Sequence, residues 1–392
     1  MSRENLTMKQ TFAFFFLFVL CVPLFGLDYV QYAVPGSDTV RNLEGRIVTQ
    51  SATSVAMELT TGERIAFNRV NIREQSSDNK EFAPLTIAEM VKVVREEFPG
   101  FKMLTSEHYI IAYQTSDAFA DWYRTILTSL NTSFTTFWKK RGVSLTPPQY
   151  PLVVVLYTSS PAFQKHAAEF VGQSDIKNIA GFYHTQKNYI FLYDSSRIHS
   201  TTSGGNVRVV GAATEQRATP AQIEEFLKRP GVTQSVNLLV HEGAHQLAYN
   251  TGLQVRGVRY PSWFTEGIAT IRGVPKRKAR NGWDIDLRID DRYYPELRKY
   301  LRTNPKDPIL TVVRSDTPFG AKETMEQSYG MAWGLTFYLL TKYPDEFVEY
   351  INTFNKARPF TADTRQKEFE QHFGTDWQKL EEDFAKEMMR LW

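Results

Sequence analysis

The residues of this chain that are best suited to chemistry lie in the motif H-E-x-x-H, formed by His241, Glu242 and His245. The surrounding segment has no proline between Thr233 and Asn250, and apolar residues recur in it at helical spacing, which predicts a helix. On a helix, residues four positions apart face the same way, so the two imidazoles can hold one cation. Glu242 is rotated by about 100° from His241. Its carboxylate therefore lies beside that cation, where a base that takes a proton from water is needed.

The two histidines need a third partner, because a catalytic zinc site usually has three protein ligands and one open position. The best candidate is Glu266, which lies further along the chain. A helix end is expected at Gly252, and a new helix is expected to begin near Ser262, its expected N-cap. Two imidazoles and a carboxylate favour zinc over metals that prefer softer ligands. The sequence therefore predicts a Zn²⁺ site formed by the two histidines and Glu266.

This pattern resembles a known family of enzymes. The H-E-x-x-H motif followed by Glu266 resembles the gluzincin metallopeptidases, and the context W-F-T-E-G-I-A resembles their peptidase-MA-like branch, which includes exported bacterial proteins. The resemblance extends from about Phe101 to the C-terminus and is sharpest at the metal-binding segments. It implies a zincin-like domain, in which a mixed sheet accompanies the metal-binding helices. It also implies hydrolysis of a peptide or protein substrate, with Glu242 as the general base.

The resemblance implies a further catalytic residue and shows one departure. Tyr329 occupies the first tyrosine position of a helix motif that follows the metal site in this branch. It is therefore expected to donate a hydrogen bond to the developing oxyanion, and the alternative is a buried structural tyrosine. Gluzincins commonly carry an acidic residue one turn after the third ligand, which orients the first histidine. Thr270 stands at that position here, so a hydroxyl or a backbone carbonyl is the expected replacement.

The resemblance also implies a substrate-binding strand. In gluzincins, a strand just before the metal-binding helix forms the wall of the cleft and pairs its backbone with an extended substrate. The strand that contains Tyr189, Ile190 and Phe191 is the candidate for this role. The alternative is an ordinary strand inside the sheet.

The segments that must position these residues predict an α+β protein. Residues 27–75 show short alternating runs separated by turns, typical of a small all-β module similar to an SH3-like barrel. Residues 76–100 are expected to form a linker and a helix, residues 101–275 the zincin-like catalytic domain, and residues 276–392 its helical C-terminal part. Within the catalytic domain, the β-branched run from Pro151 to Tyr157 predicts a strand that is buried on both faces. The β module is expected either to bind a partner of unknown identity or to cap the next domain.

The N-terminal segment, residues 1–26, predicts a secretory signal peptide. Arg3 and Lys9 precede an apolar run that extends to Leu27, and cleavage is expected near the small residue Gly26. The run is at the lower limit for a membrane span and a proline interrupts it, so no stable span is expected after the signal is removed. The alternative is an uncleaved anchor. We therefore expect export to the periplasm or the outside of a bacterial cell.

Composition narrows the chemistry and the partners. Cys21 is the only cysteine and lies in the predicted signal, so the mature chain has no thiolate ligand and no disulfide. Any metal site must then use histidine and carboxylate ligands. The formal net charge is +3 and no long stripe of Lys or Arg is present, which argues against nucleic acid as the main partner. Hydrophobic residues make up 42% of the chain, which is enough for a core and excludes wholesale disorder.

The favoured function is a zinc-dependent peptidase. One alternative is a zinc-stabilised envelope protein, in which the β module and the cleft recognise a partner without cutting it. Another is a hydrolase of a non-peptide amide, because water activated at a metal can attack any acyl carbon. The plainest alternative is an ordinary helix with two core histidines and a solvated glutamate.

Overall fold

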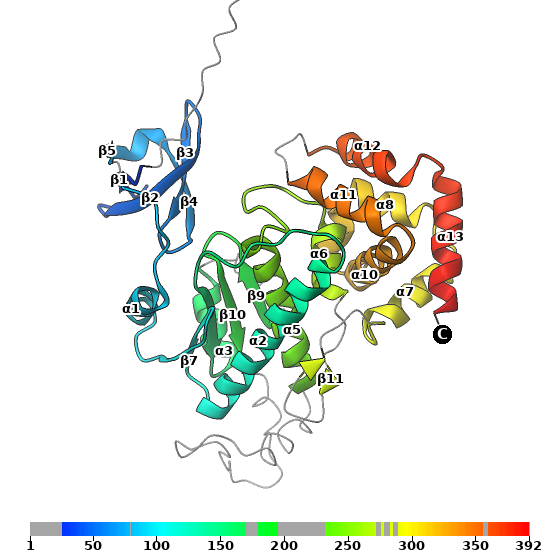
Figure 1. The fold of residues 1–392 in the computed structure, drawn as a ribbon, viewed down its shortest axis with the longest axis horizontal. Coiled ribbons are helices and arrows are strands. Elements are labelled where there is room, and N and C mark those ends of the chain that lie inside the picture. Colours follow the sequence, from blue (N-terminus) through cyan, green and yellow to red (C-terminus); the bar gives the residue numbers. More distant parts are fainter. Residues whose placement is uncertain are drawn as a thin grey trace, which may run out of the picture. The chain divides into compact units, whose positions relative to one another are not determined.

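The fold is α+β, as the sequence predicts. The computed structural model describes residues 26–78, 80–169, 179–194, 232–271, 276–277, 283–284, 289–355 and 360–391 (Figure 1). The predicted signal peptide, apart from Gly26, lies outside these residues. The chain forms two compact units. Unit 1 comprises the residues up to Met57 together with Ala66–Ala83, and unit 2 comprises Glu58–Ile65 and Pro84–Trp392.

The N-terminal strands form one five-stranded sheet with the order β4-β3-β2-β1-β5. The strands are β1 (Asp28–Ala33), β2 (Val40–Gln50), β3 (Ser54–Leu59), β4 (Arg64–Asn68) and β5 (Ile72–Ser77), and a 3₁₀ helix (Arg69–Asn71) joins the last two. The predicted small all-β module is confirmed, but the described strands form no closed barrel, because β4 and β5 do not pair. β4 buries only Phe67 and β5 buries no residue.

The tip of the β3–β4 hairpin belongs to unit 2 and carries a buried ion pair. The carboxylate of Glu58 is 2% exposed, and its Oε1 accepts hydrogen bonds from Arg64 Nε at 3.1 Å and from Arg256 at 2.8 Å. Arg256 also donates to the carbonyl of Gly62, and Arg64 donates to the carbonyl of Arg256. Because a buried charge is tolerated only when it is paired and hydrogen-bonded, each of these groups depends on the others.

Unit 2 is built on a second five-stranded sheet with the order β6-β7-β8-β10-β9. Its strands are β6 (Lys102–Thr105), β7 (Tyr109–Tyr113), β8 (Leu152–Tyr157), β9 (Gly181–His184) and β10 (Tyr189–Tyr193). The central strands β7, β8 and β10 are parallel, while β6 and β9 are antiparallel to their neighbours. The sheet is therefore mixed, and β9 is the edge strand on the side of β10.

Helices cover both faces of this sheet (Figure 1). Side chains of a strand alternate between the faces, so Val154 and Leu156 pack into one core while Val153 and Val155 pack into the other. All six residues of β8 are buried, which confirms the strand buried on both faces. On the side of the first core the sheet is covered by α2 (Asp117–Lys139) and α5 (Val232–Asn250), and on the side of the second by α1 (Ile87–Glu97) and α3 (Ser160–Ala167).

The helical C-terminal part predicted from the sequence is confirmed, and it packs around α10 (Met325–Lys342). The other helices are α6 (Ser262–Thr270), α7 (Tyr293–Leu301), α8 (Pro308–Arg314), α9 (Thr317–Gly320), α11 (Pro344–Phe354), α12 (Ala362–Phe373) and α13 (Trp377–Arg390). Two short strands, β11 (Lys276–Arg277) and β12 (Trp283–Asp284), pair with each other. Large aromatic side chains, among them Trp263, Trp333 and Tyr350, are fully buried between the helices. This packing gives α6 and α10 a rigid surrounding.

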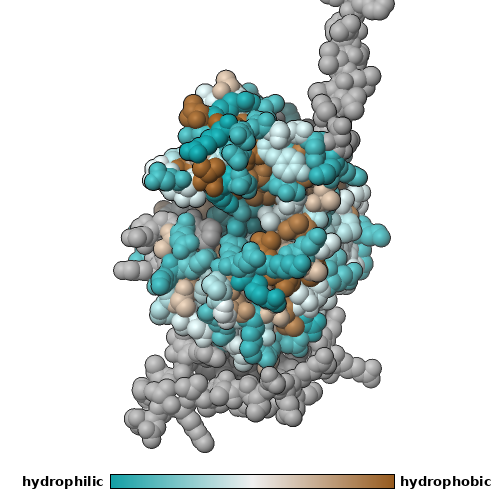
Figure 2. Space-filling view, turned by 90° about the vertical axis from the view of Figure 1, so that its left-hand side faces the viewer, coloured by the Kyte–Doolittle hydropathy of each residue, from teal (hydrophilic) through white to brown (hydrophobic). Residues whose placement is uncertain are grey.

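The face shown in Figure 2 carries hydrophobic residues in small groups between hydrophilic ones. Scattered groups of this kind are ordinary on protein surfaces and give no argument for a partner. Among the described helices, none combines the length and the apolar content that crossing a bilayer requires.

The start of α8 is capped by a carboxylate from another helix. Its N-cap residue, Asp307, makes no side-chain cap. Instead, Glu381 of α13 accepts hydrogen bonds from the backbone N–H of Ile309 at 2.8 Å and of Leu310 at 3.1 Å. Burial raises the pKa of Glu381 from 4.5 to about 7, although the two N–H donors oppose the shift. This contact ties α8 to α13 and makes part of the stability dependent on pH.

We predict that Glu381→Gln removes this pH dependence. The raised pKa means that the folded protein holds a proton on Glu381 more tightly than the unfolded chain does. The stability contributed by this group is therefore fully present below pH 4.5 and is lost as the pH rises through about 7. Urea unfolding should show that the free energy of unfolding of the parent falls between pH 5 and pH 8 by more than that of the variant. Glu382→Gln, at the neighbouring exposed position, is the control, and parallel pH profiles for the parent and Glu381→Gln would contradict the prediction.

Candidate metal centre

Helix α5 brings the two histidines of the motif together. His241 and His245 are one turn apart, and their Nε2 atoms lie 3.1 Å from each other. The two rings are nearly perpendicular, at 88°. Both ring nitrogens therefore point at a common position, as the helical spacing predicts.

The opposite side of α5 is fixed against α2. A Cβ atom on Gly243 would lie 2.6 Å from the Cδ2 atom of Leu130 in α2, so any larger residue there would require the leucine side chain to move. Leu239 and Leu247 are fully buried in the same core. The helix cannot turn about its axis without breaking this packing, and the histidines keep their direction.

Helix α6 supplies Glu266 and is held at its start and along its length. The predicted N-cap role of Ser262 is wrong, because Pro261 is the N-cap and makes no side-chain bond. The carboxylate of Asp316 instead accepts the N–H of Ser262 at 2.8 Å, and Arg365 donates to the same carboxylate oxygen. Beyond Glu266, Gly267 lies so close to α10 that an added Cβ would meet a backbone carbonyl of α10 at 2.7 Å. The position of Glu266 is thus set by contacts that are distant in sequence.

The three predicted ligands converge. Glu266 Oε2 lies 3.1 Å from His241 Nε2 and 3.6 Å from His245 Nε2. Around a tetrahedral ion with ligand distances of about 2.1 Å, neighbouring ligand atoms lie about 3.4 Å apart. The three observed separations are close to this value, so the group could hold one metal ion.

The charge state of the group also fits a cation. Burial raises the pKa of Glu266, but His245 and His241 lower it more, so the pKa lies well below its usual range. The carboxylate is therefore ionised. Its Oε2 atom is buried and no hydrogen-bond donor in the described structure satisfies it. A buried, unsatisfied carboxylate oxygen is costly unless a cation lies against it.

Glu242 lies beside the three ligands and is held by the sheet. Its Oε2 atom accepts the backbone N–H of Tyr183 in β9 at 2.8 Å, and its side chain is buried. Burial raises the pKa of Glu242, and the neighbouring Glu266 acts in the same direction, while the two histidines oppose the shift. The carboxylate that the sequence assigns as general base is therefore placed by a strand as well as by its own helix.

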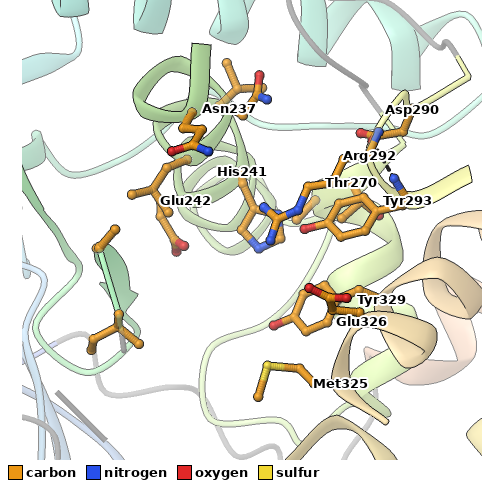
Figure 3. A pocket seen from close by; sticks show the side chains of 17 residues that line it. Asn237, His241, Glu242, Thr270, Asp290, Arg292, Tyr293, Met325, Glu326 and Tyr329 are labelled. Carbon is orange, nitrogen blue, oxygen red and sulfur yellow. Dashed lines mark hydrogen bonds between the residues drawn. The ribbon is translucent and has the colours of Figure 1, made fainter. Parts of the chain in front are cut away.

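These groups open into a cavity of about 360 Å³ (Figure 3). His241, Glu242, Thr270 and Tyr329 line it, together with the backbone that leads into β9. The ring of Tyr329 lies 6.3 Å from the His241 ring, centre to centre. Burial, followed by the charge of Glu266, raises the pKa of Tyr329, so its hydroxyl stays protonated and can donate a hydrogen bond. Tyr329 thus lies where a donor into the cavity is expected.

The structure adds three residues that the sequence reasoning did not assign to the site. Asp290, Arg292 and Tyr293 line the same cavity at the start of α7. Asp290 accepts the backbone N–H groups of Arg292 at 2.8 Å and of Tyr293 at 3.0 Å, and Tyr293 stacks on Tyr329 at 5.8 Å between ring centres. In the sequence they form only a short polar stretch without a motif. Their role depends on the packing of α7 against α10, which no local pattern reveals.

Arg292 extends toward His241 (Figure 3). Burial and the charge of Arg292 lower the pKa of His241, while Glu266 and Glu242 raise it and prevail. The guanidinium therefore contributes a positive charge to the surroundings of the ligands.

Thr270 does not replace the expected acidic residue in the described structure. Its hydroxyl donates to the carbonyl of Glu266 at 2.8 Å, and it also lies 3.2 Å from the carbonyl of Gly267. The hydroxyl hydrogen is thus used within α6. It supports the helix that carries Glu266 and donates no hydrogen bond to His241.

The predicted substrate-binding strand is wrong. Tyr189, Ile190 and Phe191 belong to β10, which pairs with β8 on one side and with β9 on the other. Both edges of its backbone are used, and all three side chains are buried in the two cores. The edge strand beside Glu242 is β9, among the strands that the structure describes. The sequence showed two adjacent strands but could not show which one is the edge.

Comparison with models of protein families gives a match to part of the chain. Residues 235–361 match a family model described as "Protein of unknown function (DUF1570)". The matched segment contains the three metal-binding candidates as well as Glu242 and Tyr329, and it covers less than half of the chain. No curated protein matches the sequence. The metal-binding segments are thus similar to a family whose activity is not described.

We predict that Gly267→Ala destabilises the protein and weakens metal binding. The new methyl group would press on a backbone carbonyl of α10, which costs about 1–3 kcal/mol of unfolding free energy. Relief of this clash would shift Glu266, the adjacent residue. Gly320→Ala is the control, because a Cβ there meets nothing within 4 Å. Thermal unfolding and metal titration of both variants test the prediction, and equal behaviour of the two would contradict it.

We also predict that one divalent ion stabilises the parent through these ligands. At a free metal concentration of about 100 times Kd, binding should add about 2.7 kcal/mol to the free energy of unfolding. His245→Ala and Glu266→Gln should lose most of this gain, whereas His108→Ala, outside the site, should keep it. Chelator-treated protein titrated with metal and unfolded by urea provides the measurement. A gain of equal size in all four proteins would show that the metal binds elsewhere.

Proposed function

We propose that this protein is a zinc-dependent peptidase of the gluzincin type, exported to the periplasm or the cell exterior. The observation that carries the proposal is the arrangement of His241, His245 and Glu266 around one position, with the buried carboxylate of Glu242 beside them. Two imidazoles and one carboxylate are the ligand set of many hydrolytic zinc sites, and they leave one position open. A structural zinc site would instead use a fourth protein ligand.

Within this proposal, each residue has a definite task. When bound, Zn²⁺ would act as a Lewis acid and lower the pKa of water. Glu242 accepts a proton from the attacking water and passes it to the leaving amine. The hydrogen bond from Tyr183 limits the positions that the Glu242 carboxylate can take, which favours a fixed proton-transfer geometry. Tyr329, with its protonated hydroxyl, donates a hydrogen bond to the oxygen on which negative charge develops.

A peptide substrate is favoured by the edge of β9. Ile179, Ala180 and Gly181, at the start of this strand, line the cavity. An extended peptide can add to a sheet edge through its main-chain hydrogen bonds, with little dependence on its side chains. Such a peptide would run past Glu242, so its backbone carbonyl groups would come within reach of the site.

A second candidate is a zinc-stabilised envelope protein that binds a partner without cutting it. The observation that favours it is the hydroxyl of Thr270, which donates to its own helix where gluzincins carry an acidic residue. Without that residue, His241 is less firmly oriented, and outer contacts of this kind typically change metal affinity or activity by about 10- to 100-fold. The peptidase remains the better-supported proposal, because a protein that only binds a partner does not need a buried carboxylate such as Glu242 beside the candidate metal ligands.

We predict that Glu242→Gln abolishes hydrolysis and retains the metal. Glutamine keeps the shape of the side chain but cannot accept the proton, so kcat should fall by at least about 100-fold. The mature chain from Leu27 and its variant would be incubated with a broad peptide mixture, and metal content would be measured in the same samples. Glu326→Gln, on the rim of the cavity, is a charge-matched control.

Zinc in both proteins with cleavage only in the parent would support the peptidase. Zinc in both with cleavage in neither would favour the binding protein or a non-peptide substrate. Undiminished cleavage by Glu242→Gln would defeat the mechanism.

A further inference from the structure

We infer that Arg292 selects substrates by binding a carboxylate next to the scissile bond. This inference rests on the proposed peptidase function and adds a substrate class to it: peptides with a negative charge at a fixed position in the cavity. The carboxylate can belong to an acidic side chain or to the C-terminus of the peptide.

The first step of the argument is the charge of the cavity wall. Arg292 is the one lysine or arginine among the described residues that line the cavity. Asp290 is turned toward the backbone, where its Oδ1 atom accepts two N–H groups. Glu326 belongs to the first turn of α10 and is exposed. The cavity wall at the start of α7 therefore carries the positive charge of Arg292 near the candidate metal ligands.

The second step is the set of partners of this cation. The guanidinium lies over the ring of Tyr293, at 5.1 Å from its centre. Within the described part of the chain, no carboxylate forms an ion pair with it, and the side chain is exposed to the cavity. An arginine with a structural role in a wall would normally have such a partner. Here its five N–H donors remain available to a ligand.

The third step is preorganisation. The backbone N–H groups of Arg292 and Tyr293 both donate to Asp290, which fixes the backbone at the start of α7, and the ring of Tyr293 supports the guanidinium of Arg292. Tyr293 in turn stacks on Tyr329, whose ring lies near His241. An arginine held in this way loses less conformational entropy when it binds a ligand. It also keeps a fixed position relative to the metal ligands.

The fourth step is the chemistry of recognition. A guanidinium matches a carboxylate through two parallel N–H···O bonds, which makes the pair strong and specific in direction. A neutral amide in the same place has one acceptor oxygen and no charge, so it forms the weaker contact. Because Arg292 lines the same cavity of about 360 Å³ as His241 and Glu242, a carboxylate that it holds lies in the same cavity as the reacting carbonyl.

The test compares Arg292→Gln and Arg292→Lys with the parent on peptides in which only the carboxylate changes. One pair has a free or an amidated C-terminus, and the other pair has Glu or Gln at each position around the cleaved bond, with an amidated end. The parent should prefer the carboxylate member of one pair by about 10- to 100-fold in kcat/KM. Arg292→Gln should lose this preference, and Arg292→Lys should retain part of it. Lys299→Gln, an exposed position on the same helix, should leave it unchanged.

A binding measurement separates this inference from the peptidase proposal. In the Glu242→Gln background, calorimetry with the same acid and amide peptides reports affinity without turnover. A preference for one carboxylate that disappears in Glu242→Gln/Arg292→Gln supports the inference, even if the parent cleaves nothing. The pair that shows the preference identifies the source of the carboxylate. Equal affinity for acid and amide, or a preference that survives Arg292→Gln, would overturn the inference whether or not peptides are cleaved.

Discussion

The structure of the site depends on the placement of one ionised carboxylate, Glu266, against two imidazoles inside the protein. An isolated buried carboxylate would be strongly unfavourable, so this arrangement requires a cation or protonated partners close to it. The helices α5 and α6 supply the three ligand atoms from opposite sides, and neither helix could do so alone. The packing around α5 and α6 holds these two helices at the separation at which the three side chains meet.

That separation is set by backbone contacts more than by polar side chains. Gly267 lets α6 approach the backbone of α10 at a distance that excludes a side chain, and Gly243 lies against leucine side chains of α2. The capping carboxylate of Asp316 fixes the start of α6 from a distant part of the chain. Small residues at such contacts leave little freedom for the helices to slide, which is what a site with fixed ligand distances needs.

The sequence predicted the parts of the site that follow from local periodicity. The relative positions of His241 and His245 depend only on helical geometry, and the buried strand from Leu152 to Tyr157 depends only on its run of apolar residues. The order of the strands depends on long-range pairing, which no local pattern encodes. For this reason the sequence does not reveal that β10 is paired on both sides, or that β4 and β5 stay apart in the first sheet. Arg292 was missed because its place in the cavity arises from the packing of α7.

The β3–β4 hairpin is continuous in sequence but is divided between the two compact units. Residues on both sides of the hairpin tip belong to the first unit, whereas the tip itself contributes Glu58 to the charge balance of the second. A shortened chain that began after the first sheet would leave the guanidinium of Arg256 buried without its carboxylate. The hairpin tip, Glu58–Ile65, therefore contributes to the stability of the larger unit.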